Sequence, residues 1–379
     1  MIKILLKRNS IHLFALYSSY FIRRIIGIII DKVFVLDLSY IYLFSMTIGE
    51  AVGGLSAFLY NIHNFKKTKE EQSFETKLIY NKIELTTTDG FFKKISLIIF
   101  AGSYDILEYI LAVFYIPNIA KTSSTIRNRL GCLSTVLSSL LCVYALGFRI
   151  GKHHKFALMC LGVCFVATLS LEFIFKPEDQ PLDRFIFAHF LIIIFLMSIS
   201  CNDCIERYLA YYNYINPFQI LMLEGIYETL MAIFYSINKD PFRGLIDGYE
   251  KNNAGGFVLL IFLLLIYLIL CGVVNVYKVY CNVRYNPMKR SLTEYFLNPV
   301  LNIYYLLAEN DFHQNYLLFT ICEVLCLITD FTFYLYNEFL VLFCCNLAHD
   351  TGDEIYIRSI TLDEIPLETI EDEEENAVE

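Results

Sequence analysis

The sequence predicts an all-α polytopic membrane protein, with about ten transmembrane helices in two inverted five-helix repeats. Hydrophobic residues make up 56% of its 379 residues and charged residues 18%, and the mean hydropathy is +0.52. Soluble domains are more charged and less apolar than this. Several apolar runs reach about 20 residues, the length that crosses a bilayer. Two of these runs carry a glycine beside a glutamate, in "IGEAVGG" and "LEGIY".

The ten expected spans are joined mostly by short polar loops. They are residues 11–31, 38–61, 94–116, 124–147, 154–176, 184–204, 217–237, 256–279, 292–308 and 315–343. The first is the weakest, because Arg23 and Arg24 stand at its centre. Arginines are costly there unless they face the bundle interior or reach the interface. A helix lying on the membrane surface is the alternative for this segment.

The distribution of Lys and Arg predicts the orientation. One side holds the N-terminal segment, the 62–93 loop, Lys278 and the C-terminal tail, and it carries most of the basic residues. Such a side faces the cytosol, so we expect both termini there. The tail "DEIPLETIEDEEENAVE" is acidic, lacks aromatic residues and reads as disordered. A basic groove on a soluble scaffold is missing, which argues against nucleic-acid binding.

The cysteines and histidines predict neither a metal site nor an enzyme. Most of the 12 cysteines fall inside spans as small apolar residues. Cys201 and Cys204 have CxxC spacing without the second pair that a zinc site needs. The seven histidines form no HExxH motif, and the chain has no GxxxxGK[ST] motif for ATP. We therefore expect no cofactor, no metal and no catalytic residues.

The ten spans divide into five and five at the "KPEDQP" loop, residues 176–181. An odd number of spans in each half inverts the second half relative to the first, as in many carriers. The second and seventh spans then correspond, and these carry Gly49–Glu50 and Glu224–Gly225. The predicted organisation is a segment 1–37 with an uncertain first helix, repeats over 38–176 and 177–345, and an acidic tail over 346–379.

Charged residues inside the spans are the candidates for a solute pathway, because ionisable groups in hydrocarbon are costly and mark functional sites. The candidates are Glu50, Asp105, Arg129, Glu224, Arg290 and Glu294. Arg290 and Glu294 are four residues apart and share a helix face. Asp203 and Glu206 stand near a span end, where we expect them at the membrane interface. Hydrogen bonding between helices is the alternative role for each buried acid.

Four stretches resemble the drug/metabolite transporter superfamily, and within it the solute carrier family 35 and nucleotide-sugar transporter relatives. They are "IGEAVGG" (48–54), "STVLSSLLCVYALGFRIGKHHKFALMCLGVCFVATL" (134–169), "CIERYLAYYNYINPFQILMLEGIY" (204–227) and "YNEF" (336–339). The resemblance implies ten helices, two pseudo-twofold-related bundles and a central site reached by rocking. The chain departs from the family's Gln-Met-x-Arg-Gly run, having "RNRLG" at 127–131.

Together these features predict a secondary carrier or exchanger of an organic solute, a nucleotide-sugar or another anionic metabolite being candidates. Glu50 and Glu224 would couple or gate, while Arg129 and Arg290 would attract an anionic group. We expect an internal membrane, that of the Golgi, endoplasmic reticulum or lysosome. The alternative is a non-transporting membrane partner or sensor built on a carrier fold, because a fold does not fix a function.

Overall fold

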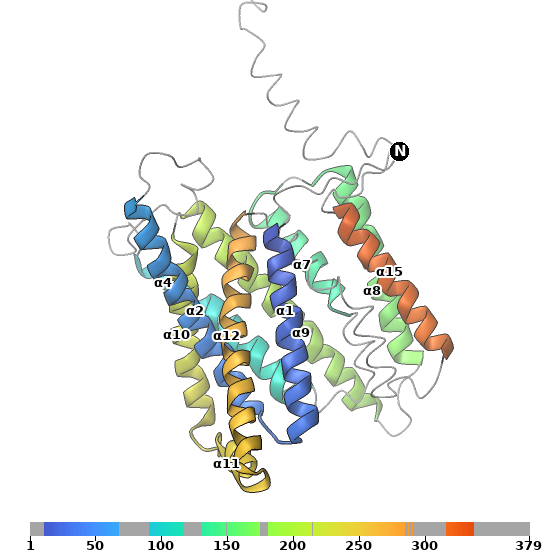
Figure 1. Ribbon diagram of the computed structural model, residues 1–379. Coiled ribbons are helices and arrows are strands. Elements are labelled where there is room, and N and C mark those ends of the chain that lie inside the picture. Colours follow the sequence, from blue (N-terminus) through green and yellow to red (C-terminus); the bar gives the residue numbers. More distant parts are fainter. Residues whose placement is uncertain are drawn as a thin grey trace, which may run out of the picture.

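The computed structural model describes residues 11–67, 91–116, 130–148, 150–174, 181–213, 215–284, 287, 290 and 316–336. Within these ranges the chain forms helices and no strand (Figure 1). Seven of the helices are long and apolar enough to cross a membrane. The all-α class is therefore confirmed for the described residues, and the seven long apolar helices agree with an integral membrane protein, whereas ten spans and an inverted repeat stay predictions. The expected span 292–308 lies outside the described residues.

The helices fall where nine of the expected spans lie. They are α1 (Ile11–Phe34), α2 (Ser39–Lys67), α4 (Phe91–Ile110), α7 (Cys132–Tyr144), α8 (Lys152–Ile174), α9 (Leu182–Arg207), α10 (Pro217–Ser236), α12 (Ala254–Arg284) and α15 (Tyr316–Tyr336). The short α11 (Arg243–Lys251) was not expected, and it connects α10 to α12. Two π-helical turns, η3 (Leu111–Tyr115) and η4 (Tyr208–Tyr212), continue α4 and α9.

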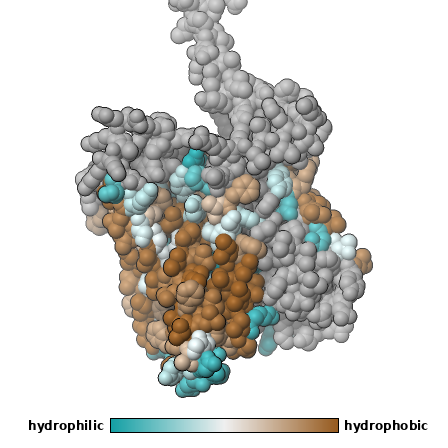
Figure 2. Space-filling view, in the orientation of Figure 1, coloured by the Kyte–Doolittle hydropathy of each residue, from teal (hydrophilic) through white to brown (hydrophobic). Residues whose placement is uncertain are grey.

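The surface of the bundle is apolar along the length of the helices. Figure 2 shows a broad hydrophobic face, with hydrophilic residues gathered at the end where α11 lies. Exposed side chains include Val163, Val166, Phe190, Phe262 and Ile269. Large apolar side chains on the outside suit lipid rather than water, and we expect the polar end near α11 to lie at the edge of the hydrocarbon layer.

Helix α2 lies at the centre of one group of helices and packs closely against both α10 and α12. A Cβ atom built on Gly53 would lie 2.8 Å from the Cα of Gly272 in α12. One built on Gly54 would lie 2.6 Å from the backbone nitrogen of Met222 in α10, and one on Gly225 would overlap the backbone nitrogen of Ala51. Small residues let membrane helices approach until their backbones touch. The glycines beside Glu50 and Glu224 thus serve this contact.

Helix α1 belongs to the same group, because it runs beside α12 (Figure 1). Ile30 and Phe34 pack with Leu260, Leu264 and Tyr267 in one buried apolar cluster. This packing, with the length and hydropathy of α1, favours a membrane-crossing helix over a surface helix for the arginine-bearing segment. A second group of helices lies to the other side: α7 packs on α9, and α8 on α15. Contacts between α4 and α9 join the two groups.

The glycine contacts predict that Gly225→Ala destabilises the fold, because the added methyl group would meet the Ala51 backbone. Overpacking of this kind costs about 1–3 kcal/mol, so the melting temperature of the purified protein should fall. Gly162→Ala in α8 is the matched control. Nothing lies within 4 Å of its added methyl group, and alanine is the better helix former by about 1 kcal/mol. Equal melting temperatures for the two variants would contradict the close packing.

Candidate functional site

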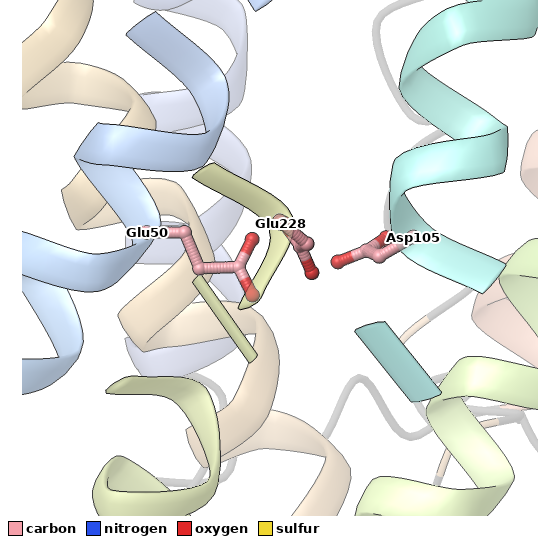
Figure 3. Close-up of side chains that lie close together, drawn as sticks. All are labelled: Glu50, Asp105 and Glu228. Atoms are coloured by element: carbon pink, nitrogen blue, oxygen red, sulfur yellow. The ribbon is translucent and has the colours of Figure 1, made fainter. Parts of the chain in front are cut away.

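Three carboxylates from three helices meet at the centre of the first group. They belong to Glu50 of α2, Asp105 of α4 and Glu228 of α10, and one oxygen of each lies within 4.8 Å of the others. Figure 3 shows the three side chains pointing toward one another. Exposure to solvent is 0%, 1% and 0% respectively. We call these three residues the acid cluster.

The acid cluster is only partly supplied with hydrogen-bond donors. The Tyr109 hydroxyl and the Asn275 side-chain amide donate to the same oxygen of Glu50, at 3.0 and 2.7 Å. The Lys278 ammonium lies 3.4 Å from one oxygen of Asp105. The second oxygens of Glu50 and Asp105, and both oxygens of Glu228, have no hydrogen-bond partner among the described residues.

Glu224 adds a fourth buried carboxylate, one helical turn before Glu228 on the same face of α10. Its side chain is fully buried, and neither oxygen has a hydrogen-bond partner in the described part of the chain. Buried polar groups are nearly always hydrogen-bonded, and an exception asks for an explanation such as a bound ion or a catalytic role. Glu224 and Glu228 are two such exceptions side by side.

The electrostatics show that the charge of this arrangement must be neutralised. Two unit charges 4.8 Å apart repel by about 3 kcal/mol at an effective dielectric constant of 20. Lys278 supplies one positive charge against the three carboxylates of the acid cluster. The remaining negative charge must be balanced by protons or by a bound cation. Oxygen ligands are those that hard cations such as Mg²⁺ and Ca²⁺ prefer.

A second polar group lies further along α12, toward Arg284. The Asn282 amide donates to Asp203 at 3.1 Å and to Glu206 at 2.6 Å, and Arg290 forms an ion pair with Asp203 at 3.0 Å. Asp203 and Glu206 are fully buried within the protein, and their expected depth at the membrane interface stays a prediction. Arg290, predicted to attract a solute, has its guanidinium against a carboxylate of the chain.

The two groups form a continuous polar file along one face of α12. Asn275, Lys278 and Asn282 stand at positions i, i+3 and i+7, which share a helix face. They contact the acid cluster at one end and the acids of α9 at the other. The file therefore leads from the acid cluster toward the C-terminal end of α12.

Sequence reasoning placed Glu50, Asp105 and Glu224 inside spans, and the structure buries all three together. It missed Glu228 and Lys278. The i, i+4 spacing of Glu224 and Glu228 was a usable signal for the first. Lys278 was counted with the basic residues of the cytosolic side although it falls within the expected span 256–279, and the structure buries it in α12, which continues to Arg284. Arg129 and Glu294 lie outside the described residues.

The pair formed by Lys278 and Asp105 predicts a strong effect on stability. Lys278→Met leaves Asp105 buried without its cation, which costs about 3–5 kcal/mol. Adding Asp105→Asn to Lys278→Met should recover part of this loss, as a thermal melt of the purified protein would reveal. Lys251→Met is the matched control: its ion pair with Asp247 is exposed, and such pairs contribute about 0–1 kcal/mol. Additive losses in the double variant would contradict the pairing.

No family model matches the chain, and no curated protein matches it either. The resemblance to the drug/metabolite transporter superfamily thus rests on the four quoted stretches alone. The chemistry of the site must be argued from its own residues.

Proposed function

We propose that the chain is a secondary transporter that moves an organic solute across a membrane and couples this movement to a proton or a hard cation. One observation carries the proposal: Glu50, Asp105, Glu224 and Glu228 are buried together within an apolar helix bundle, with six of their eight carboxylate oxygens lacking a hydrogen-bond partner among the described residues. Ionisable groups within membrane helices mark ion pathways and proton relays.

Coupling follows from competition for the same carboxylates. When a proton or a cation enters the acid cluster, it neutralises charge that Lys278 otherwise offsets at Asp105. The ion pair between α12 and α4 then weakens, and the two helices become free to move relative to each other. When the ion leaves, the lysine is drawn back. A carrier needs such a pair of states in order to alternate between the two sides of the membrane.

The wider architecture belongs to the same proposal. Ten spans, two inverted repeats and the family resemblance agree with a carrier in which mirrored helices surround a central site. In that arrangement α2 and α10 are the corresponding helices, and they pack against each other along the glycine contacts. A cytosolic location of both termini and an internal membrane remain part of the proposal. No motif for ATP was found in the sequence, so a gradient or exchange would supply the energy.

Uptake into proteoliposomes tests the function directly. The purified chain is reconstituted and offered a panel of labelled zwitterionic, anionic and nucleotide-linked metabolites, with an imposed gradient of H⁺, Na⁺ or Ca²⁺ in separate arms. We expect gradient-driven accumulation of at least one solute in one arm. Glu228→Gln should reduce this accumulation by tenfold or more, because a neutral amide cannot exchange a charge. Glu250→Gln in α11 is exposed and should behave like the unchanged protein.

Two outcomes would argue against the proposal. Accumulation that is the same in Glu228→Gln and Glu224→Gln as in the unchanged protein would remove the carboxylates from coupling. A folded protein that moves none of the solutes under any gradient would favour the non-transporting partner or sensor instead. The gradient arm that drives uptake identifies the coupling ion, since H⁺ acts through protonation and Na⁺ or Ca²⁺ through oxygen ligands.

A further inference from the structure

A crevice of about 460 Å³ lies between α1, the start of α2 and η3. It is separate from the acid cluster and from the polar file along α12. Its polar lining includes Tyr20, Arg23, Arg24, Asp31, Asp37 and Tyr42. A volume of this size is typical of small-molecule sites, which run from about 300 to 1,000 Å³. The candidate pathway residues named from the sequence are absent from this lining.

The inner end of the crevice is basic. Arg23 stands halfway along the apolar segment His12–Phe34, and its guanidinium lies 4.8 Å from the centre of the Tyr20 ring. Arg24 lines the same crevice. Charged side chains at this depth of a membrane helix face a cavity or the bundle interior and mark a binding function. Two adjacent arginines offer the planar donor groups that bind carboxylate or phosphate.

The outer end is acidic. Asp31 and Asp37 are exposed, and the Tyr42 hydroxyl donates to Asp31 at 2.6 Å. This rim lies at the end of the bundle where α11 packs, because a Cβ atom built on Gly244 of α11 would overlap the Asp37 carbonyl. The α-carbons of Arg24 and Asp31 are separated by about 10 Å along α1, at 1.5 Å per residue. The crevice thus runs from water at its rim to the middle of the bundle.

One wall is formed by the π-helical turn η3, through Ala112 and Val113. Single π turns inside α-helices occur frequently at functional sites. The same turn begins two residues after Tyr109, and the Tyr109 hydroxyl donates to Glu50 of the acid cluster. The wall of the crevice and the acid cluster are therefore built on one continuous helical segment.

The order of charges selects the ligand. A dianion that reaches the arginines would leave its second negative charge near Asp31 and Asp37, and a dication would place a positive charge beside the arginines. A molecule with an acidic group at one end and an ammonium group at the other matches both ends. We propose that this crevice is the solute site of the transporter and that it binds an elongated zwitterion, with its anionic group at Arg23 and Arg24 and its cationic group at Asp31.

This inference rests on the proposed function only in calling the ligand a transported solute. Binding of the zwitterion does not itself require transport. The same charges occur on a free zwitterionic metabolite and on the headgroup of phosphatidylethanolamine. The shared chemistry is an anionic group and an ammonium group several ångströms apart, so the probes must separate the two sources.

Binding to the purified protein in detergent tests the inference without any transport measurement. Three probes share a chain of six carbons: 6-aminohexanoate is a zwitterion, adipate a dianion and 1,6-diaminohexane a dication. Calorimetric titration should give a dissociation constant for 6-aminohexanoate at least about tenfold lower than for the other two. Glycerophosphoethanolamine serves as the headgroup probe. If it binds at least tenfold more tightly than 6-aminohexanoate, the ligand is a lipid headgroup and the assignment as a solute site is overturned.

Variants locate the binding at the two ends of the crevice. Arg23→Gln and Asp31→Asn should each weaken binding of 6-aminohexanoate by about tenfold or more, the effect of removing one charge-assisted contact. Arg23→Lys should restore part of the affinity lost in Arg23→Gln. Asp31 is exposed, so Asp31→Asn keeps the test valid even if Arg23→Gln fails to fold. Arg243→Gln and Asp240→Asn, both at exposed positions near α11, are the matched controls and should bind normally.

The inference is overturned if a folded protein binds none of the three probes, if adipate binds as well as 6-aminohexanoate, or if Asp31→Asn binds normally. Each result is separate from the fate of the proposed function. Binding that follows the charge pattern, with no uptake in proteoliposomes, would remove the transporter and retain the zwitterion site. Uptake that depends on Glu228 but not on Arg23 or Asp31 would retain the transporter and remove the zwitterion site.

Discussion

Backbone contact between α2, α10 and α12 is the constraint on which the interior of this protein depends. The three helices meet at Gly53, Gly54, Gly225 and Gly272, where added side chains would have no room. In lipid, helices gain little from burying apolar surface, so close van der Waals packing at small residues must hold them together. The same contact fixes the carboxylates, because Glu50 and Glu224 each adjoin one of the residues that touch.

The contact also explains why so much charge survives within the bundle. Helices whose backbones touch exclude water and lipid, and Glu50 and Glu228 are then fully buried between them. Only some of the buried carboxylates have hydrogen-bond donors. Tyr109 and Asn275 donate to Glu50, Lys278 lies against Asp105, and Glu228 has no donor among the described residues. A core selected for stability alone would replace such groups by apolar ones at little cost or with a gain. The proposed coupling would give these groups a use that apolar side chains could not supply.

Much of the fold could be predicted from the sequence, because membrane helices are identified by their length and hydropathy. The helix positions agree with nine expected spans, and Glu50, Asp105 and Glu224 were correctly placed inside them. The expected span ended at residue 279, and hydropathy could not show that α12 continues to Arg284. Hydropathy also could not predict which side chains contact each other between helices. The contacts of Lys278 with Asp105 and of Asn282 with Glu206 depend on the rotation of each helix about its axis. That rotation is set by tertiary packing and by the π turns.

The two π turns carry a mechanical consequence. Each begins shortly after a buried acid: η3 six residues after Asp105 of α4, and η4 two residues after Glu206 of α9. Such a turn holds one residue more than an α-helical turn and leaves a loosened hydrogen-bond ladder. If the π turn moved along the helix, the residues that it passed would rotate about the helix axis by about 100°, the angle between successive residues. For α4, the rotated residues would include the wall of the crevice. A change of charge at Asp105 could therefore be transmitted through α4 to the crevice that Arg23 and Arg24 line.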